Sequence, residues 1–112
     1  MNYDETVASG AEQYRDVLDA LDAVGLGGEF IQTGGMCAAL EVILDGGYYL
    51  LFTDQEDTLA WRREDHQGWL VGLYQADERR TVDGPLRYLL HPDGSPEKAV
   101  DLAQRVLKGE TL

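Results

Sequence analysis

The feature that most constrains the fold is a pair of apolar segments joined by Asp45-Gly46-Gly47. Residues 38–44 alternate between two sides with the period of two that is typical of a β-strand. Glycine accepts the positive φ that tight turns require, so the Asp-Gly-Gly segment predicts a hairpin turn. The partner segment, residues 48–53, is apolar on both sides, which predicts a central position in a sheet.

Further strands are expected on both sides of this hairpin. Residues 30–33 predict an edge strand, and residues 58–63 and 69–74 predict a second hairpin around the polar residues 64–68. Residues 86–90 fit either a strand or a helix, and the prolines that flank them keep the element short.

Two amphipathic helices are expected at the ends of the chain. Ser9 and Glu12 fit a capping box, and apolar residues recur at helical spacing from 11 to 24, where Gly25 provides a left-handed stop. A start nearer Asp4 is the alternative, although a glycine at position 10 weakens it. The second helix begins with Ser95-Pro96, continues with a buried stripe and ends at Gly109.

The order of these elements predicts an α+β fold. We expect an N-terminal helix, an antiparallel β-meander of four to five strands and a C-terminal helix, with both helices on one face of the sheet. A length of 112 residues indicates a single domain, 1–112. No apolar run approaches the roughly 20 residues of a membrane span, and the first residues lack the pattern of a signal peptide.

The charge is strongly asymmetric along the chain. Residues 1–57 contain twelve acidic side chains and one basic one, Arg15, whereas residues 58–112 contain nine acidic and eight basic ones. The first part therefore has a formal charge of −11 out of a total of −12. Such a chain repels nucleic-acid backbones and anionic lipid, so we expect neither as a partner. A basic protein surface, a cation or the more basic half of a second copy in a homodimer fits better.

Three segments together resemble short accessory proteins of phages that infect actinobacteria. They are Thr33-Gly34-Gly35-Met36-Cys37-Ala38-Ala39-Leu40-Glu41-Val42, Gly47-Tyr48-Tyr49-Leu50-Leu51-Phe52-Thr53-Asp54 and Gly68-Trp69-Leu70-Val71-Gly72-Leu73-Tyr74. The resemblance covers roughly the middle half of the chain. It implies a protein that acts in the cytoplasm of an infected bacterium by binding a host protein, and it assigns no catalytic residue.

Two groups of side chains are candidates for partner binding. Glu12, Asp16 and Asp19 share one face of the expected first helix, and Glu5 joins them if the helix starts early. This acidic row could present negative charge to a basic groove, although a solvated helix face has the same pattern. The second group consists of exposed anchors on the sheet, since aromatic and arginine side chains concentrate binding energy: Trp61, Arg63, Trp69 and Tyr74.

Sites for metals and catalysis are weakly indicated. Asp54, Glu56 and Asp57 place three carboxylates in one loop, which makes them weak candidates for a divalent cation, but the order of an EF-hand is missing. Cys37 lacks a histidine at a spacing that indicates a catalytic pair, and we expect it to be buried. The pattern predicts no enzyme and no cofactor.

These observations favour a small acidic, non-enzymatic interaction protein. It would bind and inhibit or redirect a host cytoplasmic protein with a basic surface through its acidic face. A small-ligand or divalent-cation-binding domain is the alternative.

Overall fold

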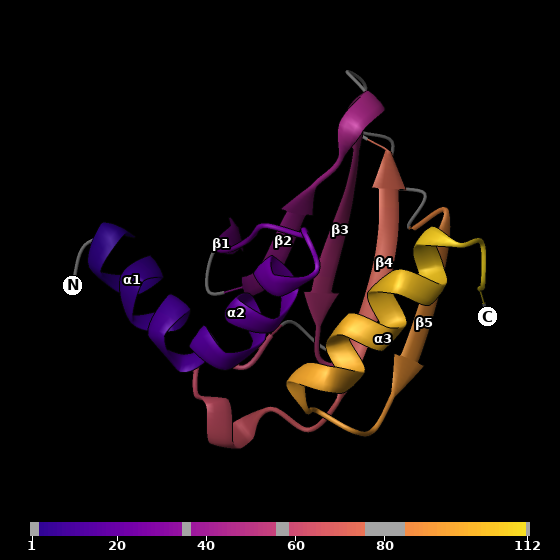
Figure 1. The fold of residues 1–112 in the computed structure, drawn as a ribbon. Helices are drawn as coiled ribbons and strands as arrows, with labels where there is room; N and C mark the ends of the chain where they lie inside the picture. Colours follow the sequence, from indigo (N-terminus) through magenta and orange to yellow (C-terminus); the bar gives the residue numbers. More distant parts are fainter. Residues whose placement is uncertain (1–2, 35–36, 56–58, 76–84, 112) are drawn as a thin grey trace.

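The computed structural model describes residues 3–34, 37–55, 59–75 and 85–111 and has an α+β fold (Figure 1). In chain order the elements are α1 (Tyr3–Gln13), α2 (Arg15–Ala23), β1 (Gly28–Gly34), β2 (Cys37–Ile43), β3 (Tyr48–Thr53), β4 (Trp69–Gln75), β5 (Arg87–His91) and α3 (Pro96–Leu107), with 3-10 turns η1 (Asp45–Gly47) and η2 (Arg63–Asp65).

The strands form a five-stranded antiparallel meander in the order β1-β2-β3-β4-β5, which confirms the predicted fold class. Gly46 and Gly47 both have positive φ, 78° and 83°, and Leu44 N donates to Tyr48 O across the turn (2.8 Å). The apolar strand β3 lies in the middle of the sheet as its composition predicts. The ambiguous segment near residue 88 is a strand.

The predicted second hairpin is wrong in its first half. Residues 59–68 are a loop that contains η2, and only 69–75 form a strand. Leu59 is fully buried and its N–H donates to Ala38 O (2.9 Å), so the apolar residues of this segment anchor a loop instead of pairing with β4.

The N-terminal helical segment starts earlier than the capping box predicts and divides in two. Ser9 lies inside α1, and the break falls at Tyr14, which has φ −113° and ψ 22°. Tyr14 is completely buried and its hydroxyl donates to Ala60 O (2.6 Å), so the break accompanies the insertion of this ring into the core. A Cβ at Gly10 would lie 2.3 Å from the ring of Phe30, and a glycine therefore lets α1 approach β1.

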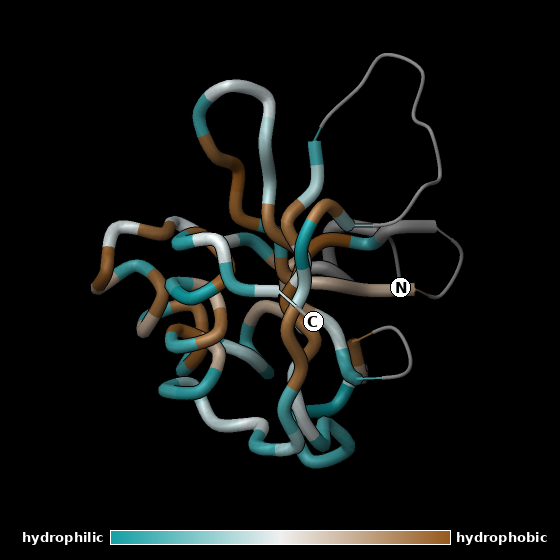
Figure 2. The backbone as a smooth tube through the Cα atoms, turned by 90° about the vertical axis from the view of Figure 1, so that its right-hand side faces the viewer, coloured by the Kyte–Doolittle hydropathy of each residue, from teal (hydrophilic) through white to brown (hydrophobic). Residues whose placement is uncertain are grey.

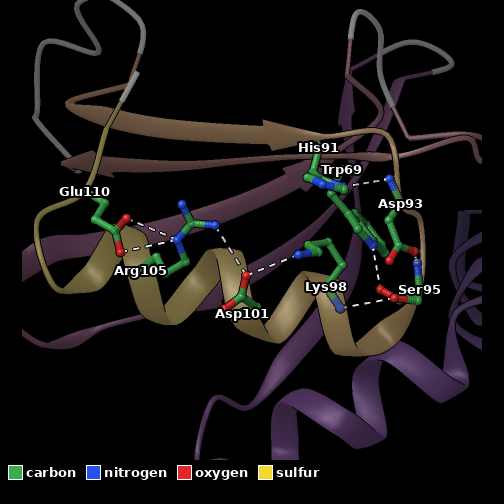
Figure 3. A network of polar contacts seen from close by, with 8 residues as sticks. All are labelled: Trp69, His91, Asp93, Ser95, Lys98, Asp101, Arg105 and Glu110. Atoms are coloured by element: carbon green, nitrogen blue, oxygen red, sulfur yellow. Dashed lines mark hydrogen bonds and ion pairs between the residues drawn. The ribbon is translucent and has the colours of Figure 1, made fainter.

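The ends of α2 and α3 follow their sequence signals. Leu26 N donates to Leu21 O (2.9 Å) and Gly25 N to Asp22 O (3.0 Å), with Gly25 at φ 81°, which is a Schellman stop. Ser95 Oγ accepts from Lys98 N (3.2 Å) and caps α3 (Figure 3).

The turn before α3 is tied to the sheet by further polar contacts (Figure 3). Asp93 Oδ1 accepts from Ser95 N (2.9 Å), and this backbone hydrogen bond is the main reason why the pKa of Asp93 is lowered. The indole of Trp69 donates to Ser95 O (2.9 Å). The sequence-predicted pair Asp101–Arg105 forms along α3 (3.4 Å).

One face of the sheet packs against α2 and α3, which also contact each other, while α1 lies along β1 (Figure 1). Figure 2 shows hydrophobic segments along the central strands and hydrophilic ones mostly in the loops and helices. Alternate residues of all five strands enter the core on the helix side: Phe30, Leu40, Val42, Leu50, Phe52, Trp69, Val71, Leu73 and Leu89. Nothing helical in the described ranges has the length and apolar character needed to cross a membrane.

Candidate functional site

The acidic row predicted on one helix is divided between two helices. Glu12 lies in α1, whereas Asp16 and Asp19 lie in α2 beyond the break. Glu12 contacts Arg15 (2.6 Å) and Asp16 contacts Arg63 (3.4 Å), so arginines of the same chain compensate two of the carboxylates. Asp19 makes no ion pair with any residue in the described ranges. Glu5 belongs to α1, and its side chain is outside the described part of the structure.

The predicted aromatic anchors are mostly not exposed. Trp69 has no exposed surface, and its indole points to the helix side of the sheet, so the prediction of an exposed anchor is wrong for this residue. Trp61 is partly buried and packs edge-on against Phe30, with ring centroids 5.3 Å apart. Tyr74 lies on the other side of the sheet and stacks on Tyr49 at 5.3 Å and 13°.

Arg63, the fourth predicted anchor, makes contacts within the protein that hold the 59–68 loop in place. Its guanidinium lies over the Tyr14 ring, 5.4 Å from the centroid, and donates to Gly94 O (2.9 Å) as well as contacting Asp16. Its backbone N–H donates to Gln13 Oε1 (2.8 Å). These contacts connect the 59–68 loop to both N-terminal helices and to the turn before α3.

Asp54 points into the protein and organises the 59–68 loop. Its carboxylate accepts from Ala60 N (2.9 Å) and Gln67 N (3.3 Å), and Oδ1 lies 2.5 Å from His66 Nδ1. Glu56 and Asp57, the other two weak metal candidates, lie outside the described residues. Within the described ranges, no three His, Cys, Asp or Glu side chains gather as metal ligands.

His66 is a buried titratable group that the sequence did not indicate. Its side chain is fully inaccessible, packs 4.0 Å from Trp69 between ring centroids and meets Tyr14 edge-on. Burial lowers the pKa of His66, against the opposing effect of Asp54, so the imidazole is held neutral. A Cβ at Gly94 would lie 2.8 Å from His66 Cδ2, and the close backbone covers the ring.

Cys37 is exposed at the start of β2, and the prediction that it is buried is wrong. The two residues before it are outside the described ranges. His66, one of the two histidines of the chain, is enclosed in the core beside Asp54.

The side of the sheet that faces away from α2 and α3 is the most extensive candidate surface. We call it the open face. Cross-strand pairs place its side chains in rows: Ile43–Tyr49–Tyr74, Glu29–Glu41–Leu51–Gly72–Tyr88, and Ile31–Ala39 followed by Thr53–Leu70–Leu90. Ile43 is 74% exposed and Leu90 39%, and most other members are half-buried.

Part of the open face is covered by the chain itself. A Cβ at Gly72 would lie 3.0 Å from Tyr74 Cε1 and 3.1 Å from Pro85 Cβ, so these two side chains lie over the centre of β4. The region over β1, β2 and β3 contains the exposed Glu29 and Ile43, whereas Ala39 in the same region is buried. It contains Glu41, Ile43 and Leu51 side by side.

Two carboxylates oppose each other in this region. Glu29 of β1 is directly across from Glu41 of β2, and both point away from the core because their neighbours Phe30, Leu40 and Val42 are buried. Burial raises the pKa of Glu41, and the negative charge of Glu29 raises it further. No ion pair in the described part of the chain involves either glutamate.

The sequence contained a signal for this surface that was used only for secondary structure. The segment 48–53 is apolar on both sides, which indicated a central strand, but the helices cover only one side of the five-stranded sheet. The excess of apolar residues on the second side therefore predicts an additional interface.

Comparisons with known proteins add no information about the site. The chain matches no protein-family model, no curated protein and no solved structure.

Proposed function

We propose that this chain is a small, non-enzymatic protein-binding module whose open face docks onto a partner protein. The observation that carries the proposal is the side of β1, β2 and β3 that no helix covers, where the exposed Ile43 adjoins the half-buried Ile31, Tyr49 and Leu51 around the pair Glu29–Glu41. Apolar patches of this kind on small domains usually mark interaction sites because their exposure to water is unfavourable.

The composition of the open face supports a protein partner. Tyr49 and Tyr74 form a rigid stacked pair beside Ile43, and Tyr88 lies two strands away from Leu51. Tyrosines give large contact areas at small cost in side-chain entropy and are frequent at the energetic centres of interfaces. The apolar side chains of the open face would form the core of the interface.

The net charge of −12 has a complementary role in this proposal. Exposed acids such as Asp19 and Asp22 would steer a basic partner toward the molecule, and this contribution falls as salt is added. The partly compensated row on α1 and α2 would thus affect the rate of association more than the lifetime of the complex. The resemblance to phage accessory proteins makes a cytoplasmic bacterial protein the preferred partner.

The arrangement of the other polar groups favours binding over catalysis or cation binding. His66 and Asp54 are enclosed and are used to hold the 59–68 loop. The carboxylate of Asp54 has backbone and imidazole partners where a cation site would need free oxygen ligands.

The test is affinity capture from a bacterial lysate with three baits: wild type, Ile43→Asp and Val24→Asp. Ile43 lies on the open face, and Val24, which is 43% exposed, follows α2 and serves as a matched apolar control. We expect one stoichiometric partner with wild type and Val24→Asp and its loss with Ile43→Asp. Equal capture by all three baits would refute the open face as the docking surface.

A further inference from the structure

We infer that the open face recognises a protein segment that combines apolar side chains with one arginine or lysine, whose cation lies between Glu29 and Glu41. This inference rests on the proposed function, because it specifies the partner that the open face accepts.

The first argument is the cost of the glutamate pair to the free protein. Like charges directly opposite each other on adjacent strands are destabilising. Glu29 and Glu41 occupy such a position, and no cation of the described chain is paired with them. An unfavourable pair of side chains that no other contact in the protein offsets is typical of a functional position.

The second argument is the apolar environment of the pair. Glu41 lies between Glu29 and Leu51 in its row, and Ile43 follows two residues further along β2. Covering Glu41 with a purely apolar partner would bury an unpaired carboxylate, which is strongly unfavourable. A cationic side chain removes this penalty, and its aliphatic stem can lie on Leu51 and Ile43.

The third argument is that the total charge disfavours a second copy of the chain as the partner. A second copy would bring another −12 charges to the interface. A distinct basic partner therefore fits this surface better than self-association.

The experiment selects ligands from a displayed library of random 12-residue peptides and measures the dissociation constant of each selected peptide by titration. In a second version of each peptide, arginine is replaced by citrulline or lysine by norleucine, which keep the shape of the side chain without its charge. The protein variants are wild type, the double variant Glu29→Gln/Glu41→Gln, Ile43→Asp and the control Val24→Asp. Urea unfolding of each variant confirms that it is folded.

The expected result is a charge-dependent preference confined to the glutamate pair. Replacing the charged residue of the peptide by its neutral counterpart should weaken binding to wild type and to Val24→Asp at least tenfold. The same replacement should weaken binding to Glu29→Gln/Glu41→Gln less than threefold. Peptides that require Ile43 but have no such preference would overturn the inference and leave the proposed function intact. Peptides that bind Ile43→Asp as well as wild type, or a library that gives no ligand, would overturn both.

Discussion

Replacing Asp54 by alanine tests the interpretation of this residue as the organiser of the 59–68 loop. The substitution leaves the N–H groups of Ala60 and Gln67 without an acceptor and removes the carboxylate beside His66 Nδ1. Hydrogen bonds to a charged group contribute about 1.5–3 kcal/mol each, and the longer Gln67 contact belongs to the lower end. We therefore expect Asp54→Ala to lose about 3–5 kcal/mol of unfolding free energy.

A graded series of variants separates this loss from a general effect of removing charge. Asp54→Asn keeps one acceptor oxygen, so it should lose about half as much as Asp54→Ala. Asp22→Ala removes an exposed acid near the end of α2 and should stay within about 0.5 kcal/mol of wild type.

Urea unfolding followed by tryptophan fluorescence measures the series, since buried Trp69 reports on the core next to His66. A loss below about 1 kcal/mol for Asp54→Ala would refute the loop-anchor argument. A melting temperature that rises with millimolar calcium or magnesium in wild type but not in Asp54→Ala would support the cation-binding alternative instead.

Three other predictions concern the close contact at Gly10, the buried His66 and the glutamate pair on the open face. Gly10→Ala should destabilise the protein by about 1–2 kcal/mol although alanine favours helices, because the new methyl group overlaps Phe30; urea unfolding measures it, and a gain in stability would contradict the close approach of α1 to β1. The lowered pKa of His66 predicts stability that is complete above the unfolded pKa of about 6.5 and declines as the pH falls below it, by up to about 1.4 kcal/mol per pH unit; this slope should disappear between pH 5 and 7 in His66→Phe and persist in His91→Gln. Glu41→Gln should stabilise the free protein by about 0.2–1 kcal/mol while it weakens partner binding, and a loss of stability would show that the glutamate pair is not unfavourable.

The main features of the fold could be predicted from local patterns. The Asp-Gly-Gly turn, the Ser95 cap and the Gly25 stop depend on neighbouring residues alone, and each is present in the structure. Apolar alternation located β2, and the apolar segment after the turn located β3, for the same reason. The meander order was predicted because consecutive strands are usually neighbours in a sheet.

The errors occurred where tertiary contacts override the local pattern. Ser9 resembles a cap, but α1 continues through it because Gly10 packs on a ring that is distant in sequence. Trp69 was expected on the exposed side, yet its indole reaches Ser95 O on the turn before α3. Similarly, Asp54 was considered only as a cation ligand, and its role in the loop depends on amide groups that come next to it only in the folded chain.

In the candidate site, too, some features could be predicted from the sequence and others depend on the folded structure. The charge and the aromatic strands of the sequence led to the hypothesis of an interaction protein, and Tyr74 lies on the side of the sheet away from α2 and α3. The opposition of Glu29 and Glu41 depends on the register between β1 and β2, which the boundaries of a short edge strand did not define.

Methyl-detected NMR with a selected peptide tests the central claim most directly. Each isoleucine and leucine methyl reports on its own surroundings, and the sheet separates them into open-face and core groups. We predict that the largest shift changes on peptide addition fall on Ile31, Ile43 and Leu51, while Leu21 and Leu102 between the helices and the sheet change little. Changes concentrated instead at Leu18 and the other residues of α2 would contradict docking on the open face and return the binding site to the acidic helices.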